Sequence, residues 1–228
     1  MLDNPIWASL TTRQSHLGWG NDLARRYPAE TAPFLGVRDA APEASAAIAE
    51  LADFGEIFYL VGVAPEAPVG WSITPLPPIA QMVFDGSTPP AASDEGVFRL
   101  GPADVSEMLA LMGAVYPGYF RPRTPEMGLY LGIRDEGRLV AMAGQRMCLE
   151  GFREISGVAT LPEFRGRGHA RRLVSLLVGE ILREGLTPFL HVDADNETAK
   201  AAYEKSGFAE RRDVALFKAL REAPEPLG

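Results

Sequence analysis

The sequence predicts an α/β (α+β) protein, and three stretches support that class. In residues 154–208, an apolar strand turns through a loop of alternating arginine and glycine into an amphipathic helix. In residues 128–161, three extended runs are joined by short glycine-containing turns, as antiparallel hairpins require. In residues 34–84, strand and helix patterns follow the order β, α, β, β, which is typical of half of an α/β domain.

The chain divides by composition into two parts. Residues 1–84 are expected to form an N-terminal α/β region, which begins with a helix that Asn4 and Pro5 start and that continues to about Gly18. Its further elements are expected as a strand, a helix and two strands at 34–37, 42–52, 57–63 and 79–84. Residues 85–95 are rich in Pro, Ser and Ala without periodicity and predict a linker. A larger domain is expected at 96–220 and a tail at 221–228.

The larger domain is expected to contain most of the sheet. Its strands are expected at 97–100, 128–134, 138–149, 152–161, 189–192, 209–212 and 214–218, and its helices at 102–112, 170–184 and 197–206. The helix after the glycine loop ends at Gly185 and carries an i, i+3, i+4 stripe of Ala170, Leu173, Val174, Leu177, Val178, Ile181 and Leu182. This stripe would press one face of the helix onto a sheet.

Charge and composition exclude several classes of protein. A net charge of −8 and a pI near 5.0 argue against general binding to nucleic-acid phosphate. No apolar run reaches the ~18 residues of a membrane span, and the N-terminus lacks the pattern of a secretory signal. Cys148 is the single cysteine, so an internal disulfide is excluded and a cytoplasmic, reduced setting is expected. The three histidines lack metal-ligand spacing, so no metal is expected.

The loop before the main helix is expected to hold a phosphorylated cofactor. It reads Arg165-Gly166-Arg167-Gly168-His169-Ala170. The first backbone N–H groups of a helix have no partner within it, and the helix dipole adds partial positive charge, so such a loop offers donors to an anion. The two glycines allow close approach and positive φ, and the two arginines add charge. Taken alone, this loop could equally be an arginine-rich surface turn.

Two motifs in this order resemble the GNAT superfamily of acyl-CoA-dependent N-acyltransferases. The loop lacks the ending of a P-loop and the spacing of a dinucleotide-binding turn. Its Arg165-x-x-Gly168-x-Ala170 is similar to the Gln/Arg-x-x-Gly-x-Gly/Ala signature of the superfamily. Downstream, the chain resembles the Asn-x-x-Ala-x-x-x-Tyr-x-x-x-Gly-Phe segment with Asn196, Ala199, Tyr203, Gly207 and Phe208. The resemblance covers roughly residues 96–220.

The resemblance implies the GNAT fold, a mixed, mostly antiparallel sheet that splays between the strand before the glycine loop and the strand after its helix. Acyl-CoA, as cosubstrate, would lie there, with its pantetheine arm along Val158, Ala159 and Thr160 and its pyrophosphate on residues 165–170. Asn196 would contact CoA, cap the following helix, or do both. Residues 1–84 would be a degenerate or truncated second copy of this fold that walls the acceptor pocket, or a purely structural extension.

The candidate catalytic residues are Tyr203 and Glu154. The resemblance implies that Tyr203 protonates the departing CoA sulfur and contacts CoA, although it could be a packing residue. Several members of the superfamily place a carboxylate where Glu154 begins its strand, and there it accepts the proton of the amine; the alternative is a solvated glutamate. Strand alternation would put Glu154, Ser156 and Val158 on one face. His191 is expected to be a neutral, hydrogen-bonded core histidine, with a second-choice base as the alternative.

Together these patterns predict an N-acyltransferase that moves an acetyl group from acetyl-CoA to a primary amine by direct transfer in a ternary complex. The acceptor would be a small-molecule or protein amine, and Tyr116, Tyr119 and Phe120 would shape its pocket or simply pack. Arg123 is a candidate for an acceptor carboxylate, and Cys148 is expected to be a buried filler. The alternatives are a non-catalytic acyl-CoA sensor and an interaction protein. No nucleic-acid or membrane partner is expected, and the chain is expected to be a monomer or homodimer.

Overall fold

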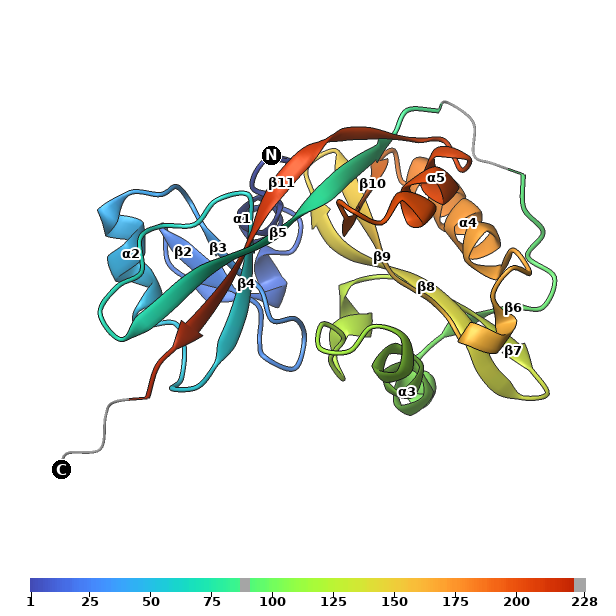
Figure 1. Ribbon diagram of the computed structural model, residues 1–228, viewed down its shortest axis with the longest axis horizontal. Helices are drawn as coiled ribbons and strands as arrows, with labels where there is room; N and C mark the ends of the chain where they lie inside the picture. The colour runs from blue at the N-terminus through green and yellow to red at the C-terminus, as the bar shows by residue number, and fades with distance from the viewer. Residues whose placement is uncertain (87–90, 224–228) are drawn as a thin grey trace.

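The computed structural model describes residues 1–86 and 91–223, and its main feature is an eight-stranded sheet (Figure 1). The strand order is β4-β11-β5-β10-β9-β8-β7-β6. Within the described ranges, every neighbouring pair in this sheet is antiparallel except β9 and β10. The mixed, mostly antiparallel sheet predicted from the sequence is therefore confirmed. Residues 87–90 of the expected linker and 224–228 of the expected tail lie outside the described residues.

The elements follow the chain in an order close to the predicted one. The strands of the main sheet are β4 (Ile57–Val61), β5 (Trp71–Phe84), β6 (Val97–Leu100), β7 (Tyr130–Asp135), β8 (Arg138–Leu149), β9 (Phe152–Thr160), β10 (Thr187–Asp193) and β11 (Phe208–Arg221). A small second sheet contains β1 (Trp19–Gly20), β2 (Ala24–Arg26) and β3 (Leu35–Val37). The α-helices are α1 (Pro5–Thr11), α2 (Pro42–Ile48), α3 (Val105–Val115), α4 (His169–Arg183) and α5 (Glu197–Glu204).

The sheet opens between β9 and β10. These parallel strands pair only at Phe152 with Thr187, Arg153 with Pro188, and Glu154 with Phe189. Beyond Glu154, β9 continues along β8, whereas β10 continues along β5 as far as Asp193. The resulting opening, called the β9–β10 gap below, leaves the edge of β9 without a strand partner on that side in the described structure.

Helices cover both faces of the sheet around this gap. In Figure 1, α4 and α5 lie on one side of β8 and α3 lies on the other. The predicted stripe of α4 is buried through Leu173, Val174, Leu177, Val178 and Ile181, which join the main core cluster with residues of α3 and β8. Gly185 follows the helix with a φ of +74°, as expected for a glycine that ends a helix.

The N-terminal part contributes a strand to the interior of the main sheet. Strand β5 lies between β10 and β11, with Ile79–Val83 paired to β10 and its whole length paired to β11. The prediction of two separate closing strands, 209–212 and 214–218, is wrong, because β11 is one strand that continues through two register irregularities. The two strands that flank β11 in the sheet, β4 and β5, both precede the expected linker. The division of the chain at residues 85–95 stays a prediction.

Two β-bulges redirect the side chains near the gap. In β9, Ser156 faces Gly144 and Ala159 faces Met142, so β9 carries one extra residue there, and Gly157 has a φ of +61°. The expectation that Val158 shares a face with Glu154 is therefore wrong, because an extra residue inverts the alternation of side chains. A second bulge lies in β8 between Gln145 and Cys148.

Candidate active site

The glycine loop has the backbone conformation that its sequence predicts. Gly166 and Gly168 both have a φ of +77°, and a Cβ atom added at either position would meet no heavy atom within 4 Å. Glycine is needed here by the backbone conformation, and the surface of the loop is open.

The start of α4 offers a set of anion donors. The first hydrogen bond of the helix joins the Arg172 N–H to the Gly168 carbonyl at 3.0 Å, so the N–H groups of the three residues before Arg172 have no acceptor within α4. Arg165 and Arg167 are exposed beside these groups. Backbone donors at a helix N-terminus with two guanidinium groups fit a pyrophosphate, so the loop fits acyl-CoA. Binding of the cofactor by these residues stays a prediction.

The β9 side of the gap fits the amide-bearing arm of acyl-CoA. Val158, Ala159 and Thr160 lie on β9 beyond its last pairing with β10. Unpaired strand backbone can donate to and accept from amide groups of a ligand. The Thr160 hydroxyl is buried and has no hydrogen-bond partner within the described residues, which leaves it available to a ligand in the gap.

Two residues of the downstream motif lie on α5. Asn196 caps the helix, since its Oδ1 accepts a hydrogen bond from the Ala199 N–H at 3.0 Å. Tyr203 is partly buried, and its ring makes an edge contact with Phe208 at 6.1 Å between centroids. Burial raises the pKa of Tyr203 to about 12, so its hydroxyl holds a proton at neutral pH. The role of Tyr203 as an acid stays a prediction.

Glu154 is the centre of a buried polar cluster. It is fully buried, and Arg146 binds its carboxylate with two hydrogen bonds of 2.7 Å, from Nε and Nη2. The Met147 N–H and His191 Nδ1 also lie within hydrogen-bond distance of the carboxylate, at 3.3 and 2.8 Å. Burial alone would raise the pKa of Glu154, but Arg146 and His191 outweigh burial and hold that pKa at about 2.

The hydrogen bonds of Gln81 fix the tautomer of His191. Arg211 donates to Gln81 Oε1 at 2.8 Å, so the amide nitrogen of Gln81 donates to the Leu2 carbonyl and to His191 Nε2, at 2.9 and 3.0 Å. His191 Nε2 is therefore an acceptor, and Nδ1 carries the ring proton that is donated to Glu154. The expected neutral, hydrogen-bonded core histidine agrees with this geometry.

The cluster changes the role assigned to Glu154. Its carboxylate has four donors around it, no exposed surface and a pKa of about 2. A proton acceptor needs a free lone pair within reach of the substrate and a pKa near the working pH. Glu154 has neither, so the general-base hypothesis does not fit the structure. The contacts that Glu154 makes are instead with Arg146, His191 and the Met147 N–H.

Sequence reasoning missed Arg146. Its only signal is that it is the one charged residue in the run 139–149, which is apolar except for Gln145 and Arg146 itself. Arg146 lies in the β8 bulge, and N-terminal side chains satisfy the backbone there: Gln14 donates to the Arg146 carbonyl at 2.8 Å, and Ser9 Oγ donates to the Cys148 carbonyl at 2.9 Å. The N-terminal region therefore supports the cluster directly. Cys148 is buried, as expected.

The aromatic loop forms a wall with the N-terminal region. Tyr116 stacks on Tyr119, with ring centroids 5.5 Å apart, and Tyr119 contacts Tyr59 of β4 at 4.6 Å. The Tyr116 hydroxyl donates to Asp193 Oδ1 at 3.2 Å across the end of β10. Phe120 instead packs on Tyr130 in the core.

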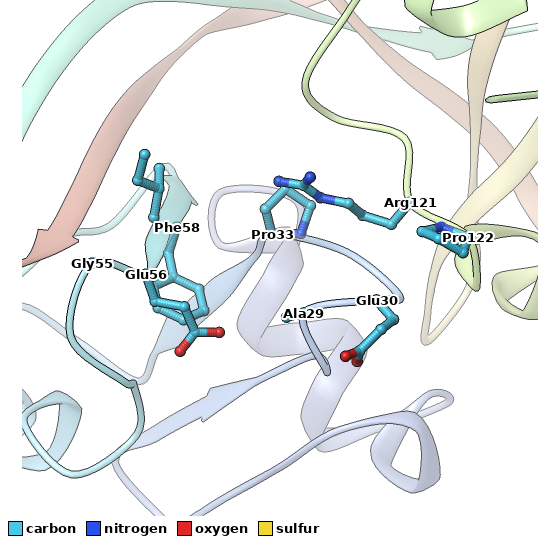
Figure 2. A pocket seen from close by; sticks show the side chains of 9 residues that line it. Ala29, Glu30, Pro33, Gly55, Glu56, Phe58, Arg121 and Pro122 are labelled. Atoms are coloured by element: carbon cyan, nitrogen blue, oxygen red, sulfur yellow. The ribbon is translucent and has the colours of Figure 1, made fainter. Parts of the chain in front are cut away.

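The two arginines of this loop differ in their partners. Arg123 makes two hydrogen bonds of 2.8 Å with Glu126, so its guanidinium is already paired. Arg121 extends over a cavity of about 440 Å³ between the N-terminal region and the aromatic loop (Figure 2). Its lining residues are Ala29, Glu30, Pro33, Gly55, Glu56, Ile57, Phe58, Arg121 and Pro122. All of them belong to segments other than β9, β10 and the glycine loop, so this cavity is separate from the predicted cofactor site.

Two other kinds of feature, a metal-binding group and a membrane-spanning helix, are absent from the described residues. These residues contain no group of three or more His, Cys, Asp or Glu side chains that could hold a metal ion. None of the described helices is long and apolar enough to cross a membrane.

Comparisons with known proteins agree with the fold. The FR47-like protein family matches residues 130–217. A protein from Novosphingobium aromaticivorans, assigned to the GNAT family, has a crystal structure that matches with a TM-score of 0.89 and 37% identity, covering 97% of this chain and 99% of that chain. A GCN5-related N-acetyltransferase from Kribbella flavida has a TM-score of 0.61 and 17% identity, covering 96% of this chain and 95% of that chain, which shows the fold alone.

Curated relatives match over shorter stretches. A mycothiol acetyltransferase from Streptomyces griseus is 32% identical over 93 residues, which is 40% of this chain and 30% of the relative. An uncharacterized protein from Mycobacterium leprae is 30% identical over 152 residues, which is 60% of this chain and 42% of the relative. The chain thus spans less than half the length of either protein.

A sheet that splays beside a glycine loop at the start of a helix defines a protein of the GNAT fold class. The match to the Novosphingobium protein extends over almost the full length of both chains at 37% identity. The chain belongs to the GNAT family, and this membership supports acyl transfer in general.

Proposed function

We propose that the protein transfers an acetyl group from acetyl-CoA to a primary amine by direct transfer in a ternary complex. The observation that carries this proposal is the open glycine loop, with its unpaired helix N–H groups, at the end of a strand that borders the gap. Burial raises the pKa of the single cysteine, Cys148. A buried, protonated thiol is a poor nucleophile, which favours direct transfer over an acyl-cysteine route.

Each part of the site has a role in this proposal. When bound, acyl-CoA supplies the activated acyl group as a thioester. Residues 165–170 hold the pyrophosphate, and the free edge of β9 at Val158, Ala159 and Thr160 aligns the pantetheine arm. Tyr203 carries a proton on its hydroxyl for the departing sulfur. The contacting rings of Tyr59, Tyr116 and Tyr119 bound the side of the site opposite the cofactor, where the amine enters.

Cofactor binding is tested by calorimetric titration with acetyl-CoA, CoA and a longer acyl-CoA. Gly168→Val is expected to abolish binding without unfolding the protein, since a side chain there obstructs the open loop and strains the backbone. Gly70→Val is the matched control, because Gly70 has the same φ of +77° and equally open surroundings. Binding that survives Gly168→Val would refute the loop assignment.

Transfer is tested by release of free thiol from acetyl-CoA with a panel of amines. Tyr203→Phe is expected to lower turnover by about 100-fold, the lower end of the range for general acid catalysis, with CoA affinity unchanged. An unchanged rate would remove Tyr203 as the acid. Tight CoA binding with no turnover on any amine would favour the sensor alternative.

A further inference from the structure

Arg146 leaves one arm of its guanidinium group free beside the gap. Nε and Nη2 bind Glu154, while Nη1 has no hydrogen-bond partner among the described residues. The side chain is 17% exposed, and its guanidinium carbon lies 4.7 Å from the centroid of the Phe34 ring. Since Glu154 is surrounded by donors, the group that this cluster offers to a ligand is the Arg146 Nη1 donor.

A carboxylate, that of Asp193, lies at the end of β10 beside Tyr116. Asp193 is exposed, and its Oδ1 accepts the Tyr116 hydroxyl at 3.2 Å. No cation partner of Asp193 occurs in the part of the chain that the structure describes. Burial and the Asp193 carboxylate raise the pKa of Tyr116, and the Arg146 guanidinium opposes them. The geometry links the two charges as well: Asp193 follows His191 by two residues on β10 and so shares its face, and His191 Nδ1 lies 2.8 Å from Glu154, the partner of Arg146.

We propose that the acceptor is an amine that also carries a carboxylate, such as a free amino acid. Arg146 Nη1 binds the carboxylate, Asp193 accepts a hydrogen bond from the amine, and Tyr59, Tyr116 and Tyr119 line the side between them. This inference rests on the proposed function. It separates a small amino carboxylate from the amine of a protein chain, which brings no carboxylate beside the reacting nitrogen.

Two observations favour Arg146 over other cationic residues as the group that binds the acceptor carboxylate. Arg123, the cation expected from the sequence to hold a carboxylate, is already paired with Glu126. Arg146 lies on β8 next to the strand that borders the gap, and its Glu154 partner is the last residue of β9 that pairs with β10. A guanidinium with a free arm at this point is preorganised for a charge-assisted hydrogen bond.

The test compares phenylalanine with phenethylamine, which lacks only the carboxylate. Wild-type protein is expected to use phenylalanine with a kcat/KM about 10- to 100-fold higher, the range for a hydrogen bond to a charged group. The double variant Arg146→Gln/Glu154→Gln keeps a neutral, hydrogen-bonded pair, so that no charge is left buried. In this variant the preference is expected to fall to about one, with CoA affinity unchanged.

Matched variants show whether the preference for phenylalanine depends on Arg146 in particular. Arg26→Gln/Glu56→Gln neutralises a second, largely buried pair and is expected to keep the preference. Asp193→Asn is expected to weaken use of both amines equally, whereas Asp195→Asn, two residues further on, is expected to weaken neither. Equal use of the two amines by wild type, or a preference that survives loss of Arg146, overturns the proposal. A preference that Arg121→Gln removes instead would place the carboxylate in the 440 Å³ cavity and also overturn it.

Calorimetry separates this inference from the proposed function. Phenylalanine and phenethylamine are titrated into CoA-saturated protein. If no amine releases thiol, the proposed function fails, yet phenylalanine binding that the Arg146 variant loses would still support the carboxylate site. No binding of phenylalanine to wild type, or equal binding to the variant, would refute the site.

Discussion

Among the described residues, two largely buried arginine–glutamate pairs each pack on a phenylalanine ring, and they differ in how many guanidinium donors they use. Arg26 pairs with Glu56 over Phe58, and Arg146 pairs with Glu154 over Phe34. Arg26 also donates to backbone carbonyls, from Nε to Tyr27 at 3.1 Å and from Nη1 to Leu51 at 2.7 Å. Arg26 thus uses every arm of its guanidinium, whereas Arg146 keeps Nη1 free.

On the proposal made above, this difference separates a structural pair from a binding pair. The Arg26 pair ties β2 to the segments around Leu51 and Glu56, so its hydrogen bonds close within the N-terminal region. A donor left free at a mostly buried position costs stability unless water or a ligand satisfies it. The Arg146 side chain is 17% exposed, so water can satisfy Nη1 in the free protein, and the proposed acceptor carboxylate would replace that water.

Replacing only the arginine of each pair should give the largest losses of unfolding free energy. Arg146→Leu leaves the Glu154 carboxylate charged and fully buried, and this is expected to cost about 3–5 kcal/mol of unfolding free energy. Arg26→Leu is expected to cost less, about 1–3 kcal/mol, because the Glu56 side chain is 22% exposed and can be hydrated. Urea unfolding measures both. Equal losses would mean that burial of the glutamate does not set the difference.

Acid unfolding should distinguish the pairs next. The folded-state pKa of Glu154 is about 2, below its usual 4.5, so its contribution is fully present above pH 4.5 and is lost as the pH falls toward 2. That contribution is on the order of 3 kcal/mol. Arg146→Gln/Glu154→Gln is expected to flatten the fall in stability between pH 4.5 and 2. Arg26→Gln/Glu56→Gln should flatten it less, and the reverse order would contradict the assignment.

The sequence predicted the parts of the site that local chemistry specifies. The positive φ values of Gly166 and Gly168, the stripe of α4 and the Asn196 cap each depend on residues a few positions apart. The splayed sheet followed from two motifs in a known order. These features agree with the structure because the backbone near them leaves few alternatives.

The rest of the site depends on contacts between distant residues. Nothing local specifies that residues 79–83 pair with β10, or that Gln14 and Ser9 satisfy the bulge at Arg146. A glycine within a strand is compatible with a bulge but does not require one, so the face of Val158 was assigned wrongly. Glu154 was recognised as important, but its role depends on a partner eight residues earlier across a hairpin.

Weakening the contacts by which the N-terminal region holds the β8 bulge should lower stability moderately. It should also affect amine use through the Arg146 pair alone. The Tyr27 hydroxyl lies 2.9 Å from Ser9 Oγ and 2.8 Å from Gln14 Oε1, both of which hold the β8 bulge. Tyr27→Phe removes these contacts and is expected to cost about 1–2 kcal/mol. It should also raise the KM for the amine with little change in CoA affinity. A stability loss without a KM effect would show that the bulge holds Arg146 unaided.

The smallest expected effect comes from the rings beneath the two guanidinium groups. Phe34→Leu and Phe58→Leu each remove a cation–π contact and ring area, for an expected loss of about 1 kcal/mol each. Only Phe34→Leu is expected to raise the KM for an amino carboxylate, because only Arg146 presents a free arm that its ring helps to orient. Steady-state kinetics on phenylalanine, with thermal unfolding in parallel, measure both quantities. If Phe58→Leu raised the KM as much, the closed Arg26 pair would also contribute to the acceptor site, and the division between structural and binding pairs would fail.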